Sequence, residues 1–211
     1  MVKLAPEGYP FILFFAVLAI VTSFFGNFVL TAVPLSLTLF MIFFFRDPER
    51  KLQEDRDIFY APADGKVIAI KETDEQELLN QRALEISIFM SPLDVHVNRS
   101  PCDGTVKEVK HYPGKFRAAF RGDSSLSNEH ITMLLDTGHG EIVVRQVAGF
   151  LARRAVCRVK LNDLLKQGQR YGIIKFSSRV DVFLPLSARA RVSINDRVKA
   201  GESVIAEINN S

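Results

Sequence analysis

The chain contains 35 consecutive residues without a charged side chain, from Phe11 to Phe45. One membrane-spanning helix needs about 20 apolar residues, so this run is too long for a simple single span and somewhat short for two. Gly26 and Asn27 divide the run, and Pro34 interrupts its second half. We therefore expect a transmembrane helical hairpin over residues 11–45, with a single tilted span as the alternative.

Two other interpretations of this run are less favoured. A secretory signal peptide has an apolar core of about 7–15 residues and a small-residue cleavage site, whereas this run continues into FFFRDPERK. A buried core helix is the second. Lys3 precedes the run and Arg46, Arg50 and Lys51 follow it, and this positive charge predicts that both ends lie on the cytoplasmic side. We expect residues 1–48 to anchor residues 49–211 to the cytoplasmic face of the cell membrane.

Beyond Pro48 the sequence predicts a mainly β soluble domain. Short apolar runs recur about every ten residues between turn residues, as in antiparallel sheets. A short helix is expected at Gln76–Arg82 and a helical turn at Asn162–Lys166. The expected strands are Val67–Lys71, Leu84–Phe89, Gly104–Lys110, Ile131–Asp136, Glu141–Val147, Cys157–Leu161, Ile173–Phe176, Val180–Leu184 and Val204–Ile208.

The run DRVKAGESVI, from Asp196 to Ile205, resembles the turn-and-strand pattern of lipoyl- and biotinyl-type β-barrels. It supports hybrid-barrel-like sheets, but no MKM-like lysine is present for a prosthetic group. The formal net charge of +3 is too small to predict a nucleic-acid partner. Cys102 and Cys157 form no CxxC pattern, and the four histidines lack metal-ligand spacing, so we expect no metal site.

A Ser-Ser pair, Ser177 and Ser178, lies inside the apolar alternating run from Gly168 to Pro185. Taken alone, the pattern indicates a strand with two small residues at a bulge. His96 projects from an apolar stretch between Val95 and Val97, where a lone histidine is more often structural than catalytic.

Several other polar residues have two interpretations. Asp64 stands in the turn APADGKV, as an ordinary turn carboxylate or as one that orients a histidine. The loop stretches HYPGKFRAAF and SLSNEHI are candidate site loops or solvated turns. The cations Lys115, Arg153 and Arg154 are candidate phosphate or headgroup contacts, or outward-facing charges.

Together these stretches resemble the phosphatidylserine decarboxylases in their short bacterial and archaeal form. The resemblance covers nearly the whole chain in order. It is carried by EGYPF (Glu7–Phe11), FFRDPER (Phe44–Arg50), APADGKV, IFMSPLDVHVNRSP (Ile88–Pro101), YPGKF (Tyr112–Phe116), SNE (Ser127–Glu129), GFLARR (Gly149–Arg154) and GQRYGIIKFSSRVDVFLP.

The resemblance implies a β-rich proenzyme that cuts itself between Ser177 and Ser178 into β and α chains. Ser178 would become an amino-terminal pyruvoyl group, and the two chains would stay together as a heterodimer that can dimerise further. The sequence departs from the family pattern at two places. Ser177 replaces the usual glycine, and Arg99 replaces the second histidine of the long-form HxxH motif.

The implied reaction is the decarboxylation of phosphatidylserine to phosphatidylethanolamine and CO2. The amine of the lipid would form a Schiff base with the pyruvoyl group, and His96 would return a proton after CO2 departs. Asp64 matches the family's triad aspartate and is expected to pair with His96. Lys115, Arg153 and Arg154 would contact the headgroup or the membrane surface.

Two alternatives of other classes are open at this point. A membrane-anchored serine hydrolase would use Ser178, His96 and Asp64 in an uncut chain, although no GxSxG motif is present. A non-catalytic membrane-tethered β-barrel module would also remain uncut, and it would carry no carbonyl group.

Overall fold

A computed structural model describes residues 3–52, 55–114, 128–149, 155–175 and 178–209. The chain forms two compact units, Met1–Glu49 and Arg50–Ser211. The mainly β prediction is confirmed, since most described residues of the second unit lie in strands, and the helices α1 and α2 belong to the first.

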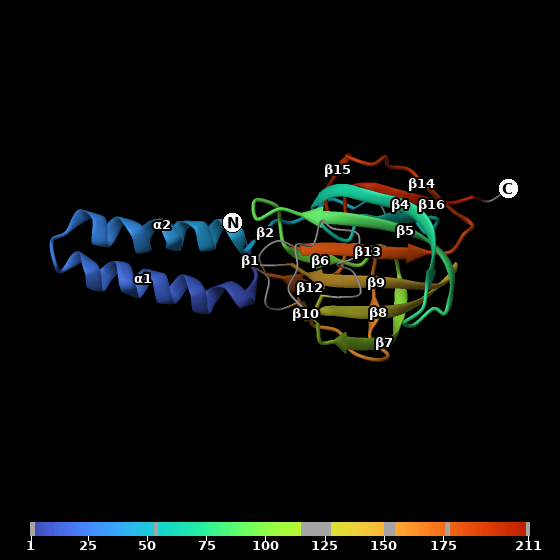
Figure 1. Cartoon of the computed structure of the whole chain (residues 1–211), viewed down its shortest axis with the longest axis horizontal. Helices are drawn as coiled ribbons and strands as arrows, with labels where there is room; N and C mark the ends of the chain where they lie inside the picture. Colours follow the sequence, from blue (N-terminus) through green and yellow to red (C-terminus); the bar gives the residue numbers. More distant parts are fainter. Residues whose placement is uncertain (1–2, 53–54, 115–127, 150–154, 176–177, 210–211) are drawn as a thin grey trace. The chain divides into compact units, whose positions relative to one another are not determined.

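The first unit is a helical hairpin, as predicted (Figure 1). A 3-10 turn, η1 (Pro6–Gly8), leads into α1 (Tyr9–Ser23), and α2 (Phe28–Phe44) returns. Gly26 adopts φ +66°, a conformation that glycine takes without strain. The Asn27 side chain accepts hydrogen bonds from two backbone N–H groups at the start of α2. At the open end, β1 (Lys3–Leu4) pairs antiparallel with β2 (Arg46–Asp47).

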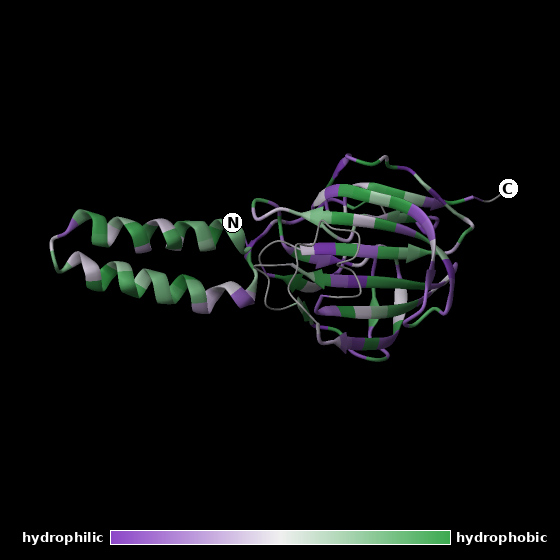
Figure 2. Ribbon diagram, viewed as in Figure 1, coloured by the Kyte–Doolittle hydropathy of each residue, from purple (hydrophilic) through white to green (hydrophobic). Residues whose placement is uncertain are grey.

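Both helices of this hairpin consist mostly of hydrophobic residues (Figure 2), and many of their large apolar side chains are exposed. Phe24 and Phe28, beside the turn, are 84% and 83% exposed. The segment Pro6–Ser23 is long and apolar enough to cross a membrane, and Phe28–Phe44 is shorter. The first unit therefore supplies one apolar helix that could anchor the chain in a bilayer.

Within the described residues, the strands of the second unit form three sheets. The eight-stranded sheet has the order β11-β7-β8-β9-β13-β5-β4-β15, and two three-stranded sheets have the orders β10-β12-β6 and β14-β16-β3. The strands are β3 (Ile58–Tyr60), β4 (Gly65–Glu75), β5 (Gln81–Met90), β6 (Val97–Arg99), β7 (Gly104–Tyr112), β8 (His130–Thr137), β9 (Gly140–Ala148), β10 (Ala155–Cys157), β11 (Leu164–Leu165), β12 (Arg170–Ile174), β13 (Ser178–Leu184), β14 (Ala188–Ala190), β15 (Arg197–Val198) and β16 (Val204–Ile208).

The two predicted helical pieces of this unit are wrong. At Gln76–Arg82 the Glu75 carboxylate accepts hydrogen bonds from three following N–H groups, which forms a tight turn, and β5 then begins at Gln81. At Asn162–Lys166 the first residue has φ +71°, and β11 pairs with β7 instead.

Two predicted strand boundaries also need correction. The strand expected at Cys157–Leu161 lies earlier, at β10, because the described residues that pair with β12 are 155–157. The strand expected at Ile173–Phe176 is β12, which begins at Arg170 and ends at Ile174; Phe176 lies outside the described residues.

Strand β13 is central to the large sheet and alternates between two buried faces. Val180, Val182 and Leu184 belong to the main apolar core, which also contains Ile88 and Val144 from the neighbouring strands. The intervening residues Arg179, Asp181 and Phe183 face the other side and are also buried. Because both faces are covered, every side chain of β13 is fixed by packing.

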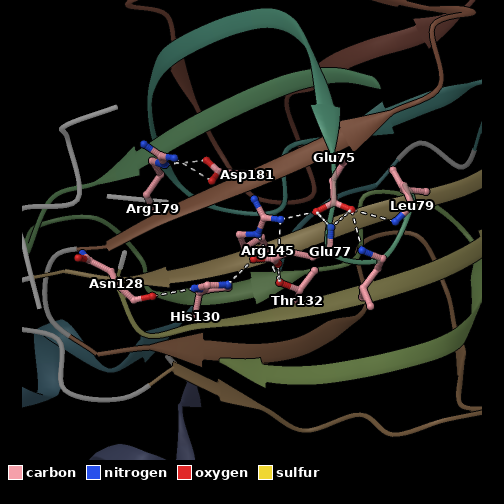
Figure 3. Close-up of polar contacts among 10 residues, drawn as sticks. Glu75, Glu77, Leu79, Asn128, His130, Thr132, Arg145, Arg179 and Asp181 are labelled. Atoms are coloured by element: carbon pink, nitrogen blue, oxygen red, sulfur yellow. Dashed lines mark hydrogen bonds and ion pairs between the residues drawn. The ribbon is translucent and has the colours of Figure 1, made fainter. Parts of the chain in front are cut away.

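A buried charge cluster lies on the second face (Figure 3). The Arg145 guanidinium contacts Glu75 and lies 2.9 Å from Glu77 Oε2. His130 Nε2 is 2.8 Å from Glu77 Oε1, and the Thr132 hydroxyl donates to Glu77 Oε2 at 2.9 Å. Burial alone would raise the pKa of Glu77, but the His130 hydrogen bond, the Arg145 charge and the Thr132 hydrogen bond outweigh it and lower that pKa to about 2.

This cluster predicts a specific loss of stability in acid. Glu77 has a folded-state pKa below its ordinary value of 4.5, so its contribution is complete above pH 4.5 and disappears as the pH falls towards 2. Glu77→Gln should lower the free energy of unfolding at pH 7 by about 1–3 kcal/mol. It should also flatten the dependence of the thermal midpoint on pH between 4.5 and 2.

Glu72→Gln is the matched control, because Glu72 lies on β4, the strand that leads into the turn of Glu77, in an exposed pair with Arg82. We expect it to change neither the thermal midpoint at pH 7 nor its acid dependence. Equal pH profiles for Glu77→Gln and the wild type would contradict the role given to the cluster.

Candidate functional site

Ser178 is the first residue of β13 and is fully buried. It pairs with Met90 of β5 on one side and with Ala148 of β9 on the other. Its hydroxyl donates to the Met90 thioether sulfur, with an Oγ–Sδ distance of 3.3 Å. Two neighbouring strands therefore fix the position of this serine. Ser177 lies outside the described residues.

Two buried amides, those of Asn98 and Gln146, lie near Ser178 and were not predicted as site residues. Asn98 Nδ2 is 3.8 Å from the same Met90 sulfur, and Gln146 Nε2 donates to Asn98 Oδ1 at 2.8 Å. The only sequence signal for Asn98 is its position two residues after His96. Gln146 stands in a regular apolar strand, where nothing marks it as functional.

His96 is fully buried between β5 and β6. Its Nδ1 is 2.9 Å from the backbone oxygen of Asp94. A carbonyl oxygen only accepts hydrogen bonds, so Nδ1 carries the proton and Nε2 is the basic nitrogen of the neutral ring. The Asp94 backbone oxygen thus orients the His96 ring, in a tautomer that suits proton transfer through Nε2.

Asp64 is held in a different set of contacts. Both of its carboxylate oxygens accept from Arg50 Nη2, at 2.7 and 2.9 Å, and Oδ1 also accepts from the Ala200 N–H at 2.8 Å. None of its described contacts is to His96. Burial raises the pKa of Asp64, against the opposing effects of the Ala200 N–H and Arg50. Asp64 therefore joins Arg50 to the turn before β16.

Arg99 stands near that turn. It is buried, and its Nη1 donates to the backbone oxygen of Gly168 at 2.9 Å. A side chain at Gly201 would come within 3.2 Å of the Arg99 Cδ atom. The residue that replaces the second histidine of the long-form motif is therefore an arginine that binds a backbone carbonyl.

The charge cluster on the other face of the sheet is linked to Ser178 through Asn128. His130 Nδ1 is 2.7 Å from the Asn128 backbone oxygen (Figure 3). Asn128 Nδ2 donates to the Ala148 backbone oxygen at 2.8 Å. Ala148 is the cross-strand partner of Ser178. On β13 itself, Arg179 makes a two-point ion pair with Asp181, with distances of 2.7 and 3.0 Å. Buried polar contacts therefore fix both strands beside the serine.

The remaining candidates contribute less. Lys115, Arg153 and Arg154 lie outside the described residues, as do Ser125, Leu126 and Ser127 of the SLSNEHI stretch. Both cysteines are free thiols. Burial raises the pKa of Cys102 to about 12, and burial also raises the pKa of Cys157, so neither is a thiolate nucleophile at neutral pH. Among the described residues no group of three or more His, Cys, Asp or Glu side chains could hold a metal ion.

Comparisons with known proteins agree on one family. The family model described as phosphatidylserine decarboxylase matches residues 37–206. A phosphatidylserine decarboxylase proenzyme of Desulfotalea psychrophila is 43% identical over 208 residues, covering 98% of this chain and 97% of the relative.

Proteins with the same description from two further organisms are similar over nearly their whole length. The protein of Paraburkholderia xenovorans is 40% identical over 206 residues, which cover 97% of each chain. That of Burkholderia vietnamiensis is 41% identical over 206 residues, covering 97% of this chain and 96% of the relative. This chain therefore belongs to the phosphatidylserine decarboxylase family.

Proposed function

We propose that this chain decarboxylates phosphatidylserine to phosphatidylethanolamine and CO2, using a pyruvoyl group made from Ser178. The observation that carries the proposal is the agreement between the family membership and the fully buried serine at the start of β13. The family relatives are described as proenzymes, which supports processing of the chain before it acts. A hydrolase or a non-catalytic module has no comparable support.

The surroundings of Ser178 fit this conversion. The Ser178 oxygen would attack the carbonyl carbon of Ser177, forming a C–O bond as the C–N bond breaks. Loss of the Cα proton would then break the Cβ–Oγ bond, and the oxygen would leave in the new carboxylate of Ser177. Hydrolysis of the remaining dehydroalanine releases ammonia and leaves a keto group. Met90 can serve both states, because its sulfur accepts from the hydroxyl and packs equally well against a methyl group.

The sheet explains how a cut chain would stay assembled. After cleavage, residues 178–211 would still form β13 between β5 and β9, and β16 would still pair with β3. These strands supply a heterodimer of β and α chains without any linker, and that pair can dimerise further. The pyruvoyl group supplies an electrophilic carbonyl that takes up the electron pair released with CO2.

We assign two further roles to described residues. His96 would take up a proton at its basic Nε2 and return it to the carbon after CO2 leaves, since the Nδ1 proton is donated to the Asp94 carbonyl. Asp64 fixes Arg50 and the turn at Ala200 beside the site. Its expected pairing with His96 stays a prediction, and Arg50 competes for the same carboxylate.

The lipid substrate accounts for the anchor. A hairpin in the cell membrane would hold the domain at the cytoplasmic surface, where a two-chain lipid is met without leaving the bilayer. Lys115, Arg153 and Arg154 are then headgroup or surface contacts, since a cation matches an anionic phosphodiester.

The direct test of the proposal is an assay with phosphatidylserine vesicles. The wild-type protein should release CO2 and convert the lipid to phosphatidylethanolamine, measured by mass spectrometry of the extracted lipids. Ser178→Ala should give none above background, because no carbonyl can form. Conversion by Ser178→Ala, or no conversion by a wild-type protein that has been cut, would contradict the proposal.

A His96→Gln variant should separate processing from the lipid reaction. Loss of the proton donor should lower the rate of decarboxylation by about 10²–10⁴-fold, while the chain is still cut. The measurement is product formation per mole of cut chain. His111→Gln is the control, since His111 is an exposed histidine on β7, and it should keep the wild-type rate. An equal loss in both variants would argue against His96.

Asp64→Asn should lower the free energy of unfolding by about 3–5 kcal/mol, because Arg50 would keep its buried charge without a full partner. Arg50→Met combined with Asp64→Leu should recover much of that stability. If this double variant is stable and is cut normally, the role of Asp64 is structural, through its ion pair with Arg50. If it folds but stays uncut, Asp64 acts in the processing reaction, as the pairing with His96 predicts.

A further inference from the structure

The amide pair of Asn98 and Gln146 lies where apolar side chains would be expected. Asn98 is fully buried and Gln146 is 1% exposed. On β9, Gln146 faces the same side as Val144 and Ala148, which belong to the main apolar core. Polar groups at such positions cost folding free energy unless every donor and acceptor is paired.

One atom of this pair does not meet that condition. Gln146 Oε1 is buried and has no hydrogen-bond partner within the described part of the chain. The other polar atoms of the two amides are engaged. Gln146 Nε2 donates to Asn98 Oδ1, and Asn98 Nδ2 points to the Met90 sulfur.

The Met90 sulfur determines which amide atom is left over. A sulfur accepts hydrogen bonds only weakly and attracts an N–H rather than a carbonyl oxygen. Turning both amides would place Asn98 Oδ1 against that sulfur, and turning Gln146 alone would place two oxygens face to face. The arrangement with Oε1 left over is therefore the favourable one, and a ligand at this position must donate a hydrogen bond.

A close approach of two sheets makes this arrangement possible. Gly172 of β12 pairs with Asn98 of β6, and an added Cβ at Gly172 would lie 2.8 Å from Gln146 Nε2. The same Cβ would lie 2.3 Å from the Val156 backbone oxygen, so a larger residue at 172 would disturb both the pairing with β10 and the amide. The sheet β10-β12-β6 therefore packs directly against the Gln146 side chain and restricts its position.

The Gln146 side chain lies beside Ser178. On the paired strands, Gln146 is two residues from Ala148, the direct partner of Ser178, so the two residues are diagonal neighbours. Diagonal neighbours on one face are within reach of a long side chain. The contacts from Gln146 through Asn98 and Met90 to the Ser178 hydroxyl also form an unbroken chain.

We propose that Gln146 Oε1 accepts a hydrogen bond from the amine nitrogen of the substrate bound at position 178, and that Asn98 holds the amide in place. The inference rests on the proposed function, because it needs an amine substrate. Of the polar groups in a phosphoserine headgroup, the amine is the one that donates, whereas the carboxylate and phosphate accept. Gln146 would therefore recognise the nitrogen and reject the two acidic groups.

The test uses the shape-matched double variant Asn98→Leu/Gln146→Met in the full-length chain. Replacing both partners of a buried hydrogen bond is often neutral or stabilising. In the uncut Ser178→Ala background, we expect the double variant to keep or raise the thermal midpoint. In a chain that keeps Ser178, the double variant should still be cut, but the rate at which position 178 captures an amine should fall by at least 10-fold. Capture is measured with phosphatidylethanolamine vesicles and cyanoborohydride, from the mass added to the C-terminal chain.

Val144→Ala is the matched control, because Val144 lies on the same strand and face. It should lower the thermal midpoint but leave amine capture per cut chain unchanged. Gln146→Met alone provides the same comparison if the double variant does not accumulate.

The outcomes separate the inference from the proposed function. Capture by the double variant at the wild-type rate would overturn the inference, and so would a fall in its thermal midpoint as large as that of Val144→Ala. A wild-type chain that is cut but captures no amine would overturn the proposed function, and the inference with it.

Discussion

The pairing of β13 on both sides is the constraint on which the rest of the site depends. Strands β5 and β9 pair with β13 from Ser178 onwards. The backbone of Ser178 and the direction of its side chain are therefore fixed. A reaction that converts a main-chain residue into a reactive group needs such a fixed frame, because the group must remain aligned after its own peptide bond has been broken. The same pairing would hold the two products of cleavage together.

Both faces of this central strand carry buried polar groups, and their placement has a pattern. On one face, Arg179 and Asp181 neutralise each other, and the Glu77 cluster is anchored by several hydrogen bonds. On the other face, the polar groups are neutral amides close to Ser178. Charges away from the reacting atoms can stiffen the sheet, while neutral amides near them avoid competing with a charged substrate. The apolar surroundings of Ser178 also favour a reaction that removes a charged carboxylate.

Much of the fold followed from local pattern, whereas part of the site did not. The hairpin and most strands were predictable, because chain hydropathy and alternation report burial directly. The Gln76–Arg82 helix was wrong because Glu75 caps a turn there, which propensity does not show. Family motifs pointed to Ser178, but Gln146 depends on a contact between distant strands. A regular strand residue gives no sign of such a contact in a single sequence.

The central claim is that Ser178 becomes the reactive carbonyl, and intact mass after denaturation tests it most directly, with and without hydroxylamine. The account predicts two chains that meet between Ser177 and Ser178, of which only the C-terminal one gains mass from the reagent. Full cleavage is compatible with Ser177, since only its carbonyl is attacked. A single uncut chain of 23.7 kDa that gains no mass would contradict the account. Ser177→Gly would then show whether the residue before the cut is what prevents it.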